Sequence, residues 1–219
     1  DPAKHFSMFG VQRRLPGYAE ISRRVPQYAI WDNHDYGPGP TDKRAPRKTD
    51  SLRAFQMLWP NPAFGEADNP GVYFKFTRGD LDFFMLDGRY YRDPDNSPDD
   101  GKKTHLGEKQ LAWLKRELLA SKAKIKVLAA GGEWQMHGQA ASWSSFPRER
   151  ADLFKFIDDN KITGLLLLSG DRHFTASYQV GGKFIEVTSV NSASNRIVVN
   201  SGCGGLKNGY LTRGKTQVV

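Results

Sequence analysis

Short apolar runs along this chain are separated by longer segments with helical periodicity. Strand-length runs occupy residues 25–31, 72–76, 81–86, 124–130 and 163–169, with shorter ones at 184–187 and 197–199. Runs of this length, bounded by turn residues, are typical of buried β-strands. The runs at 72–76 and 81–86 flank the sequence Arg78-Gly79-Asp80, so together they predict a β-hairpin.

Three longer segments carry apolar residues three or four positions apart, which is the spacing of an amphipathic helix. These segments are residues 49–59, 107–121 and 147–160. The last begins with Pro147, a residue favoured in the first turn of a helix. Strands, helices and hairpins in this order predict one layered α/β domain over residues 1–219, with a mixed β-sheet flanked by helices.

The composition agrees with a folded, basic protein. The 219 residues are 38% hydrophobic and 12% aromatic, which is enough for a core. The net charge of +8 favours an anionic partner, although the basic pairs are scattered along the chain. No run reaches the ~18 apolar residues of a membrane span. The single Cys203 excludes an intrachain disulfide framework, and the first residues do not have the pattern of a signal peptide.

Polar residues suited to metal binding or acid–base chemistry follow two of the predicted strands. After the run at 25–31 comes Trp31-Asp32-Asn33-His34-Asp35, and after the run at 163–169 comes Gly170-Asp171-Arg172-His173. Because ligands bind at the carboxyl ends of strands in α/β sheets, we expect these two segments to meet. Each segment alone is also compatible with an ordinary hydrogen-bonded turn.

The candidate metal ligands are Asn33, Asp171 and His173. They offer an amide oxygen, a carboxylate and an imidazole. Mixed oxygen and nitrogen ligation suits zinc, iron or manganese, while an oxygen-rich subsite suits calcium or magnesium. The candidate general acid is His34, and Asp35 would orient its imidazole and raise its pKa.

A third polar segment follows the predicted strand at 81–86 and reads Asp87-Gly88-Arg89-Tyr90-Tyr91-Arg92. Arg89 and Arg92 are candidate substrate-binding residues, since guanidinium groups present paired donors to phosphate oxygens. A structural ion pair with Asp87 or another carboxylate is the alternative.

Other catalytic signatures are absent from the sequence. It contains no Gly-x-Ser-x-Gly, no Walker loop and no dinucleotide-binding fingerprint. Glu133 and His137 follow the run at 124–130, and we expect them to support the site or line its rim. Cys203 lies among glycines without any motif around it, which favours a small buried thiol over a nucleophile.

Jointly, the three polar segments resemble the successive signatures of the PhoD-like alkaline phosphatases and phosphodiesterases. This family belongs to the calcineurin-like metallophosphoesterase superfamily. The resemblance is carried by residues 30–37, 86–92 and 168–173, which occur in the expected order. It covers roughly residues 20–205 and depends on the three motifs together, since each is short.

The resemblance implies a metallophosphoesterase-type sandwich, in which two mixed β-sheets flanked by helices carry a two-metal centre at their edge. It implies hydrolysis of phosphate mono- or diesters, often by secreted or periplasmic enzymes. Iron and calcium are the implied metals, with zinc, manganese or magnesium as alternatives. By position, Asn33, Asp171 and His173 fall on ligand sites, His34 on the histidine that assists the leaving group, and Arg89 on the motif's arginine.

Two features depart from the family pattern. Asn33 stands where Asp is usual, which removes one negative charge from the ligand set. The family's early motifs, which supply further ligands, have no counterpart before Asp32. We therefore expect an incomplete sandwich and the C-terminal portion of a phosphoesterase catalytic domain.

Two alternative functions remain open from the sequence. One is a catalytically inactive, truncated member of the same family, and the other is an anion- or nucleic-acid-binding module that uses the +8 charge. As an enzyme, the protein would act on a small phosphate ester or a phosphodiester, with nucleic acid as one candidate substrate. The sequence leaves the oligomeric state open.

Overall fold

The computed structural model describes residues 7, 10, 11, 13–37, 39–135, 142–172 and 175–189, and the backbone of 196–199 and 212–213. Its helices are α2 (Pro16–Arg24), α3 (Asn33–Tyr36), α4 (Lys48–Leu58), α5 (Glu108–Ala120) and α6 (Pro147–Asp159), with the 3₁₀ turn η1 (Trp143–Ser145). Its strands are β1 (Gly65–Glu66), β2 (Asn69–Pro70), β3 (Phe74–Arg78), β4 (Leu81–Met85), β5 (Ile125–Ala129), β6 (Leu165–Ser169), β7 (Thr175–Val180), β8 (Phe184–Thr188), β9 (Arg196–Val199) and β10 (Thr212–Arg213).

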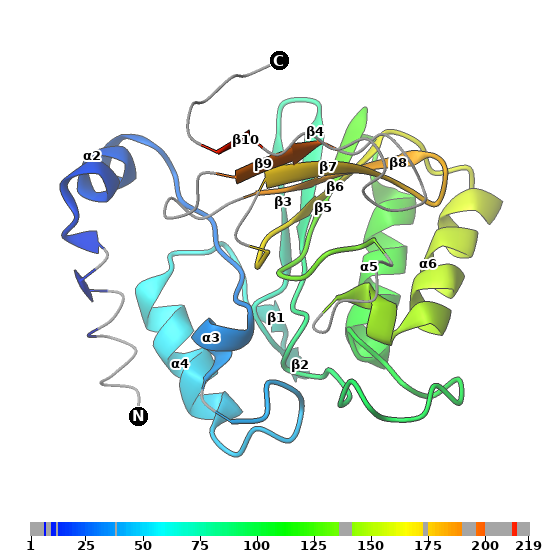
Figure 1. The fold of residues 1–219 in the computed structure, drawn as a ribbon, viewed down its shortest axis with the longest axis horizontal. Coiled ribbons are helices and arrows are strands. Elements are labelled where there is room, and N and C mark those ends of the chain that lie inside the picture. The colour runs from blue at the N-terminus through cyan, green and yellow to red at the C-terminus, as the bar shows by residue number, and fades with distance from the viewer. Residues whose placement is uncertain are drawn as a thin grey trace.

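The described part of the chain is organised around one mixed sheet of eight strands. Their order is β10-β9-β7-β8-β6-β5-β4-β3 (Figure 1). The neighbours β4, β5, β6 and β8 run parallel, while β3 and β7 pair antiparallel with β4 and β8. Strands β1 and β2 form a separate two-stranded ribbon. Because β4, β5 and β6 are parallel, their carboxyl ends lie at one edge of the sheet.

The main core lies between this sheet and helices α5 and α6, which stand side by side in Figure 1. Leu114 of α5 and Ile157 of α6 are fully buried there, against Phe84, Leu128 and Leu167 from the strands. Each such side chain contributes roughly 1.5–3 kcal/mol by leaving water. The apolar periodicity of the two helices is thus explained by their packing on β4, β5 and β6.

A second, smaller apolar cluster fixes the chain between α2 and α4. Leu52 and Phe55 of α4 pack there with Trp31, Val72 and Tyr90. The Trp31 ring meets the Phe55 ring edge-on, with centroids 5.4 Å apart, and lies parallel to the Tyr90 ring at 6.3 Å. This cluster holds the segment around residue 31 against the end of β4.

The predicted fold class is confirmed, since a mixed sheet flanked by helices forms the structure. The predicted hairpin is β3–β4, and the predicted helices are α4, α5 and α6 to within about two residues at each end. The predicted strands at 124–130, 163–169, 184–187 and 197–199 correspond to β5, β6, β8 and β9.

The structure also extends and corrects these predictions. Strand β7 is not among the predicted strands, although Ala176, Tyr178 and Val180 alternate with polar residues as in a half-buried strand. The resemblance implied two sheets, whereas the described residues form one main sheet and the β1–β2 ribbon. Among those residues no helix is long and apolar enough to cross a membrane.

The strand predicted at residues 25–31 is wrong. The segment is extended but pairs with no strand in the described structure. Asn61 takes the place of a partner: its Nδ2 donates to Ala29 O at 2.8 Å, and its Oδ1 accepts from Ala29 N at 3.1 Å. Tyr28 stacks on Phe76 of β3 with centroids 4.0 Å apart. The Asn61 amide therefore satisfies the backbone hydrogen bonds of Ala29, and the aromatic contact packs the segment against β3. These contacts replace the strand pairing that the apolar pattern predicts.

We expect Asn61→Ala to lower the free energy of unfolding by about 1–3 kcal/mol, because both backbone groups of half-buried Ala29 lose their partner. Chemical denaturation measures this loss. The matched control is Asn160→Ala, which removes an exposed side-chain bond to Phe156 O and should change stability by less than about 0.5 kcal/mol. Equal losses in the two variants would contradict the bridging role of Asn61.

Candidate active site at the carboxyl ends of the strands

The loops that follow β5 and β6 meet at the carboxyl edge of the sheet. Gly170 N donates to Gly131 O at 3.0 Å, which joins the two loops directly. Asp32 lies against the same point: a Cβ on Gly131 would fall 2.7 Å from Asp32 Oδ1 and 2.9 Å from Asp32 Cβ. Only glycine leaves room for this approach, so Gly131 lets the segment around residue 32 reach the strand ends.

The segment after Asp32 forms a single helical turn, α3. Asp32 precedes the turn, and its backbone N donates to Asp35 Oδ2 at 3.3 Å, as in a capping box. Asn33 Oδ1 accepts from His34 N at 2.9 Å. His34 is exposed, and Asn33 and Asp35 are half-buried. The bond from Asp32 N to the Asp35 carboxylate thus orders the turn, while the His34 side chain is exposed to solvent.

Arg89 forms the central ion pair of the site with Asp32. Its Nε and Nη2 donate to Asp32 Oδ1 at 2.7 and 2.5 Å. The Arg89 side chain is only 2% exposed and that of Asp32 is 18% exposed. Arg89 Nη1 adds longer contacts of 3.4 Å to the carbonyl and hydroxyl oxygens of Thr41. Hence Arg89 couples the strand end after β4 to the segment that carries Asn33 and His34.

The second oxygen of Asp32 gives the site its electrostatic character. Asp32 Oδ2 is buried and has no hydrogen-bond partner within the described ranges. Burial raises the pKa of Asp32, the neighbouring Asp171 charge raises it further, and Arg89 opposes both effects. A buried oxygen beside a second carboxylate is a position that a cation would stabilise.

Asp87 organises the turn that presents Arg89. Its carboxylate is fully buried, and Oδ1 accepts from Trp31 Nε1 at 2.7 Å, Arg89 N at 2.9 Å and Tyr90 N at 3.0 Å. Its Oδ2 accepts from Val72 N at 3.0 Å. The structural ion pairs that the sequence leaves open do form, but with other carboxylates than Asp87: Arg89 pairs with Asp32, and Arg92 pairs with Asp95. Asp87 instead accepts a hydrogen bond from the Arg89 backbone.

The other predicted arginine, Arg92, lies beneath the surface at 1% exposure. Its Nε and Nη2 donate to Asp95 Oδ1 at 3.1 and 2.5 Å, and its guanidinium lies 4.5 Å from the centroid of the Phe146 ring. Burial lowers the pKa of Arg92, as does the nearby Arg89 charge. Arg92 Nη1 has no partner within the described part of the chain.

Two buried glutamates, Glu186 and Glu133, bind the loops that follow β5 and β6. Glu186 Oε1 accepts from Trp134 N at 2.9 Å and from Ser169 Oγ at 2.6 Å, and Oε2 accepts from Gln135 N at 2.9 Å. Glu133, also fully buried, forms an ion pair with Arg172 at 3.1 Å between Oε2 and Nε. The sequence predicts that Glu133 supports the site or lines its rim, and it gives no signal for Glu186, which lies within a strand without any motif.

The structure thus brings Asn33, His34, Asp35, Arg89 and Asp171 to one edge of the sheet, through Asp32 and its contacts. The predicted ligand His173 and the candidates His137 and Cys203 lie outside the described residues. Within those residues, no group of three or more His, Cys, Asp or Glu side chains is placed to hold a metal ion. The Asp171 carboxylate near Asp32, whose Oδ2 has no partner among those residues, nevertheless offers oxygen donors of the kind that hard cations prefer, and Asn33 carries an amide oxygen in the adjoining turn.

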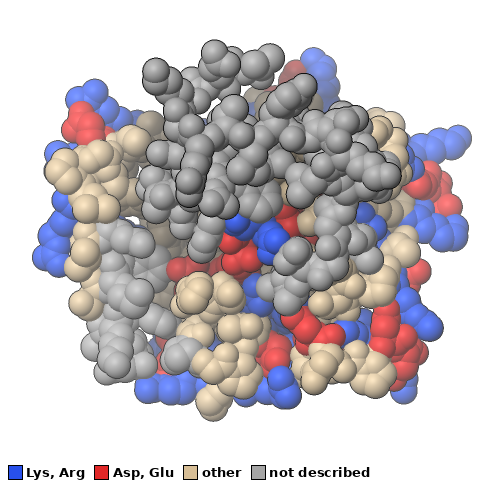
Figure 2. Space-filling view, in the orientation of Figure 1, with Lys and Arg blue, Asp and Glu red and all other residues tan. Residues whose placement is uncertain are grey.

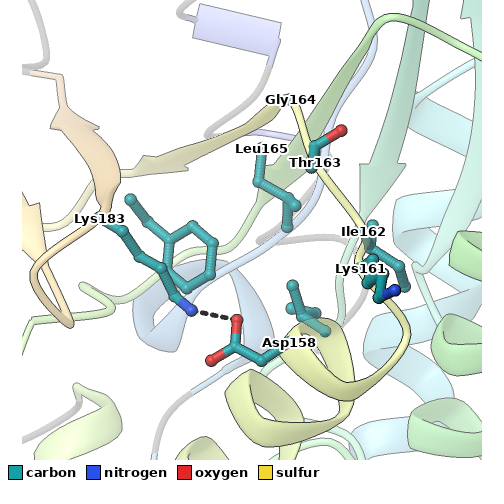
Figure 3. A pocket seen from close by; sticks show the side chains of 9 residues that line it. Asp158, Lys161, Ile162, Thr163, Gly164, Leu165 and Lys183 are labelled. Carbon is teal, nitrogen blue, oxygen red and sulfur yellow. Dashed lines mark hydrogen bonds and ion pairs between the residues drawn. The ribbon is translucent and has the colours of Figure 1, made fainter.

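A cavity of about 550 Å³ lies at the opposite edge of the sheet, next to the amino ends of β6 and β8 (Figure 3). Its walls include Ile162, Leu165 and Phe184, and an ion pair joins Lys183 to Asp158 across it. It is separated from the strand-end carboxylates by the length of the strands. We therefore do not assign it to the candidate active site.

The surface charge is dispersed. In Figure 2, Lys and Arg lie around the visible face and are interspersed with Asp and Glu. Many basic side chains are paired, such as Arg116 with Glu66 and Lys124 with Asp80. The visible described residues thus form no continuous basic tract of the kind that a nucleic-acid groove uses.

Comparison with known proteins identifies a family and relatives that match most of the chain. The sequence profile described as PhoD-like phosphatase matches residues 9–216. The chain is 28% identical over 216 residues to alkaline phosphatase D of Bacillus subtilis (strain 168), a match that covers 78% of this chain and 36% of that protein. A solved structure of PhoD superposes with a TM-score of 0.62 at 21% identity, covering 76% of this chain and 40% of that chain. The chain therefore spans well under half of each relative, and the structural match confirms the fold.

We expect Asp87→Asn to destabilise the protein by about 2–4 kcal/mol. The amide cannot accept a bond from Val72 N while its oxygen serves Trp31, Arg89 and Tyr90, so a buried donor loses its partner. Urea denaturation measures the effect. Asp80→Asn, in the exposed β3–β4 turn, is the control and should cost less than about 1 kcal/mol. A loss for Asp87→Asn as small as the control's would contradict the organising role.

Because the pKa of Glu186 is raised in the folded protein, we expect the stability of the protein to depend on pH. Burial, reinforced by the Glu133 charge, raises its pKa from 4.5 to about 7, although its hydrogen bonds oppose the change. Between these values the folded chain binds more protons than the unfolded chain, so the stability from this group falls as the pH rises through that window. The difference corresponds to roughly 3 kcal/mol.

Glu186→Gln cannot titrate and provides the reference. Denaturation of both proteins at about pH 5 and about pH 8 should show the stability of the wild type, relative to the variant, falling by up to roughly 3 kcal/mol at the higher pH. Parallel pH profiles in the two proteins would exclude a titration of Glu186 in this range.

Proposed function

The chain belongs to the PhoD-like phosphatase family, and we propose that it hydrolyses phosphate mono- or diesters by means of a metal-activated water. The observation that carries this proposal is the meeting of Asp32, Arg89 and Asp171 at the carboxyl edge of a parallel strand group. A basic group and two carboxylates held at such an edge suit a site that binds a phosphoryl group and cations.

We assign the metal-ligand role to Asn33, Asp171 and His173, and two metal ions, with iron and calcium favoured, complete the site. When bound, these ions would neutralise the phosphoryl charge and activate the attacking water. The unpartnered Asp32 Oδ2 and the adjacent Asp171 supply the negative potential that attracts them. Zinc, manganese and magnesium are the alternatives for the same oxygen and nitrogen donors.

His34 and Arg89 act on the substrate side in this proposal. His34 is exposed at the start of the α3 turn, so its imidazole is accessible to donate a proton to the leaving oxygen. Asp35 orders the same turn through Asp32 N. Arg89 adds a fixed positive charge and holds Asp32, and Arg92 reinforces that charge from the buried position next to it.

We propose that the 219 residues are the C-terminal portion of the catalytic domain, because the early motifs of the family pattern have no counterpart before Asp32. The match to 36% of alkaline phosphatase D agrees with a portion of a longer protein. The natural substrate is then a small phosphate ester or a phosphodiester. The family relation supports a location outside the cytoplasm. Cell fractionation with an antibody against this chain tests that location.

The function is tested by metal content and turnover on the same samples. Elemental analysis by mass spectrometry and hydrolysis of bis-p-nitrophenyl phosphate and p-nitrophenyl phosphate are measured for the wild type, Asp171→Ala and His173→Ala. The wild type should contain metal, and each variant should lose metal and roughly 100-fold or more in turnover. Asp80→Ala removes an exposed carboxylate in the β3–β4 turn and should change neither.

Wild type that contains no metal and hydrolyses neither compound would contradict the proposal for this chain. Binding of phosphate esters with a steep salt dependence and without turnover would instead support an anion-binding module. Comparing the rates with the mono- and the diester separates the two substrate classes.

A further inference from the structure

Asp171 lies in a strained turn. Its φ is +69°, and Arg172 N donates to Gly170 O at 2.9 Å, which closes a three-residue γ-turn around it. Turns of this kind, with a positive φ at the central residue, are rare and strained for any residue except glycine. They persist where the surrounding structure holds both sides in place. The contacts on either side of Asp171 therefore determine where its carboxylate points.

The side before Asp171 is fixed to the sheet. Ser169 Oγ donates to Glu186 at 2.6 Å, and Ser169 O accepts from Ser189 N at 3.0 Å. Gly170 O accepts from Thr188 Oγ1 at 3.3 Å. Glu186 and Thr188 both belong to β8, the strand next to β6. Strand β8 thus holds the approach to the turn by side chains as well as by its backbone.

The side after Asp171 is fixed by a partly buried ion pair. Arg172 Nε lies 3.1 Å from Glu133 Oε2, and the side chains are 20% and 0% exposed. Glu133 Oε2 also accepts from Gln135 Nε2 at 2.5 Å. Glu133 follows β5, and the next two backbone N–H groups donate to Glu186. The two glutamates therefore connect the β5 loop, the β6 loop and strand β8 into one unit.

The two glutamates bind the loops as well as the strands beneath them. The Glu186 carboxylate accepts from Trp134 N and Gln135 N in one loop and from Ser169 Oγ at the start of the other, so it joins both loops at once. Both glutamate side chains are fully buried. Buried carboxylates that join both loops next to a strained turn indicate a role in geometry.

We propose that Glu186, through Ser169, and Glu133, through Arg172, are positioning residues that hold the Asp171 turn in its metal-binding conformation. This inference rests on the proposed function, since it assigns a purpose to the Asp171 carboxylate. Neither glutamate is proposed as a ligand or as a group that reacts with the substrate.

The test uses the full chain in four variants. Arg172→Met removes the ion pair, Arg172→Lys retains the charge, and Glu186→Gln replaces a carboxylate oxygen by an amide. Asp82→Asn is the control, because Asp82 is a buried carboxylate that accepts from Thr77 Oγ1 and Ser121 Oγ at the opposite end of β4. Amide hydrogen exchange of Gly170, Asp171 and Arg172 is measured without metal, and Mn²⁺ affinity is measured by calorimetry.

We expect Arg172→Met and Glu186→Gln to accelerate exchange at the turn and to weaken Mn²⁺ binding roughly 10- to 100-fold. Arg172→Lys should recover most of both properties. Asp82→Asn should lose stability yet leave both within about twofold of the wild type, because it lies far from the turn.

Unchanged exchange at the turn in Arg172→Met and Glu186→Gln would overturn the inference, whatever the activity. Faster exchange with unchanged Mn²⁺ affinity would overturn it too, because Mn²⁺ binding would then not depend on the conformation that the two glutamates stabilise. A wild type that binds no Mn²⁺ and hydrolyses no phosphate ester overturns the proposed function itself, and the positioning role with it. This last result is recognised from the wild type alone.

Discussion

The ion pair between Arg89 and Asp32 is the interaction on which the candidate site depends. Asp32 belongs to a segment that forms no strand and is joined to the sheet by side chains. Asp87 closes the connection, because it accepts from Trp31 Nε1 and from the Arg89 backbone while the Arg89 guanidinium binds Asp32. A buried ion pair broken on one side leaves an uncompensated charge, which is strongly destabilising. Losing any member of this ring would therefore release the turn that carries Asn33 and His34.

The same arrangement explains why the carboxylates of the site tolerate each other. Asp32 and Asp171 come from segments about 139 positions apart in the chain, and their charges repel. Arg89 offsets the repulsion from one side through Asp32 Oδ1, and Oδ2 is left facing a position without a described partner. In the proposed function, this oxygen supplies a preformed negative charge to which a cation would bind. Such preorganisation is how sites obtain affinity for charge from fixed groups.

The sequence predicted the elements whose signal is local and the motifs whose residues are contiguous. Helices such as Glu108–Ala120 and the strand before Asp171 follow from apolar periodicity and length alone. The failure at residues 25–31 has the opposite origin, since Asn61 supplies bonds that a strand would supply and the pattern cannot show this. Arg89 was predicted to meet phosphate, but only the fold reveals that its nearest partner is Asp32. Glu186 carried no signal at all, because its partners lie in loops that are distant in sequence.

Asp87 and Glu186 illustrate one solution to a general problem of sheet edges. Loops at the ends of parallel strands leave backbone N–H groups that must find acceptors when they are buried. Here a single carboxylate accepts from several of them, as Asp87 does for Val72, Arg89 and Tyr90, and Glu186 does for Trp134 and Gln135. An apolar side chain in either place would leave those donors unsatisfied, so the cost of burying the acid is offset locally. The buried carboxylates thereby fix the backbone of the loops that carry the proposed ligands. The side chains of those ligands need not stabilise the loops, so in the proposed function they are available for metal and substrate.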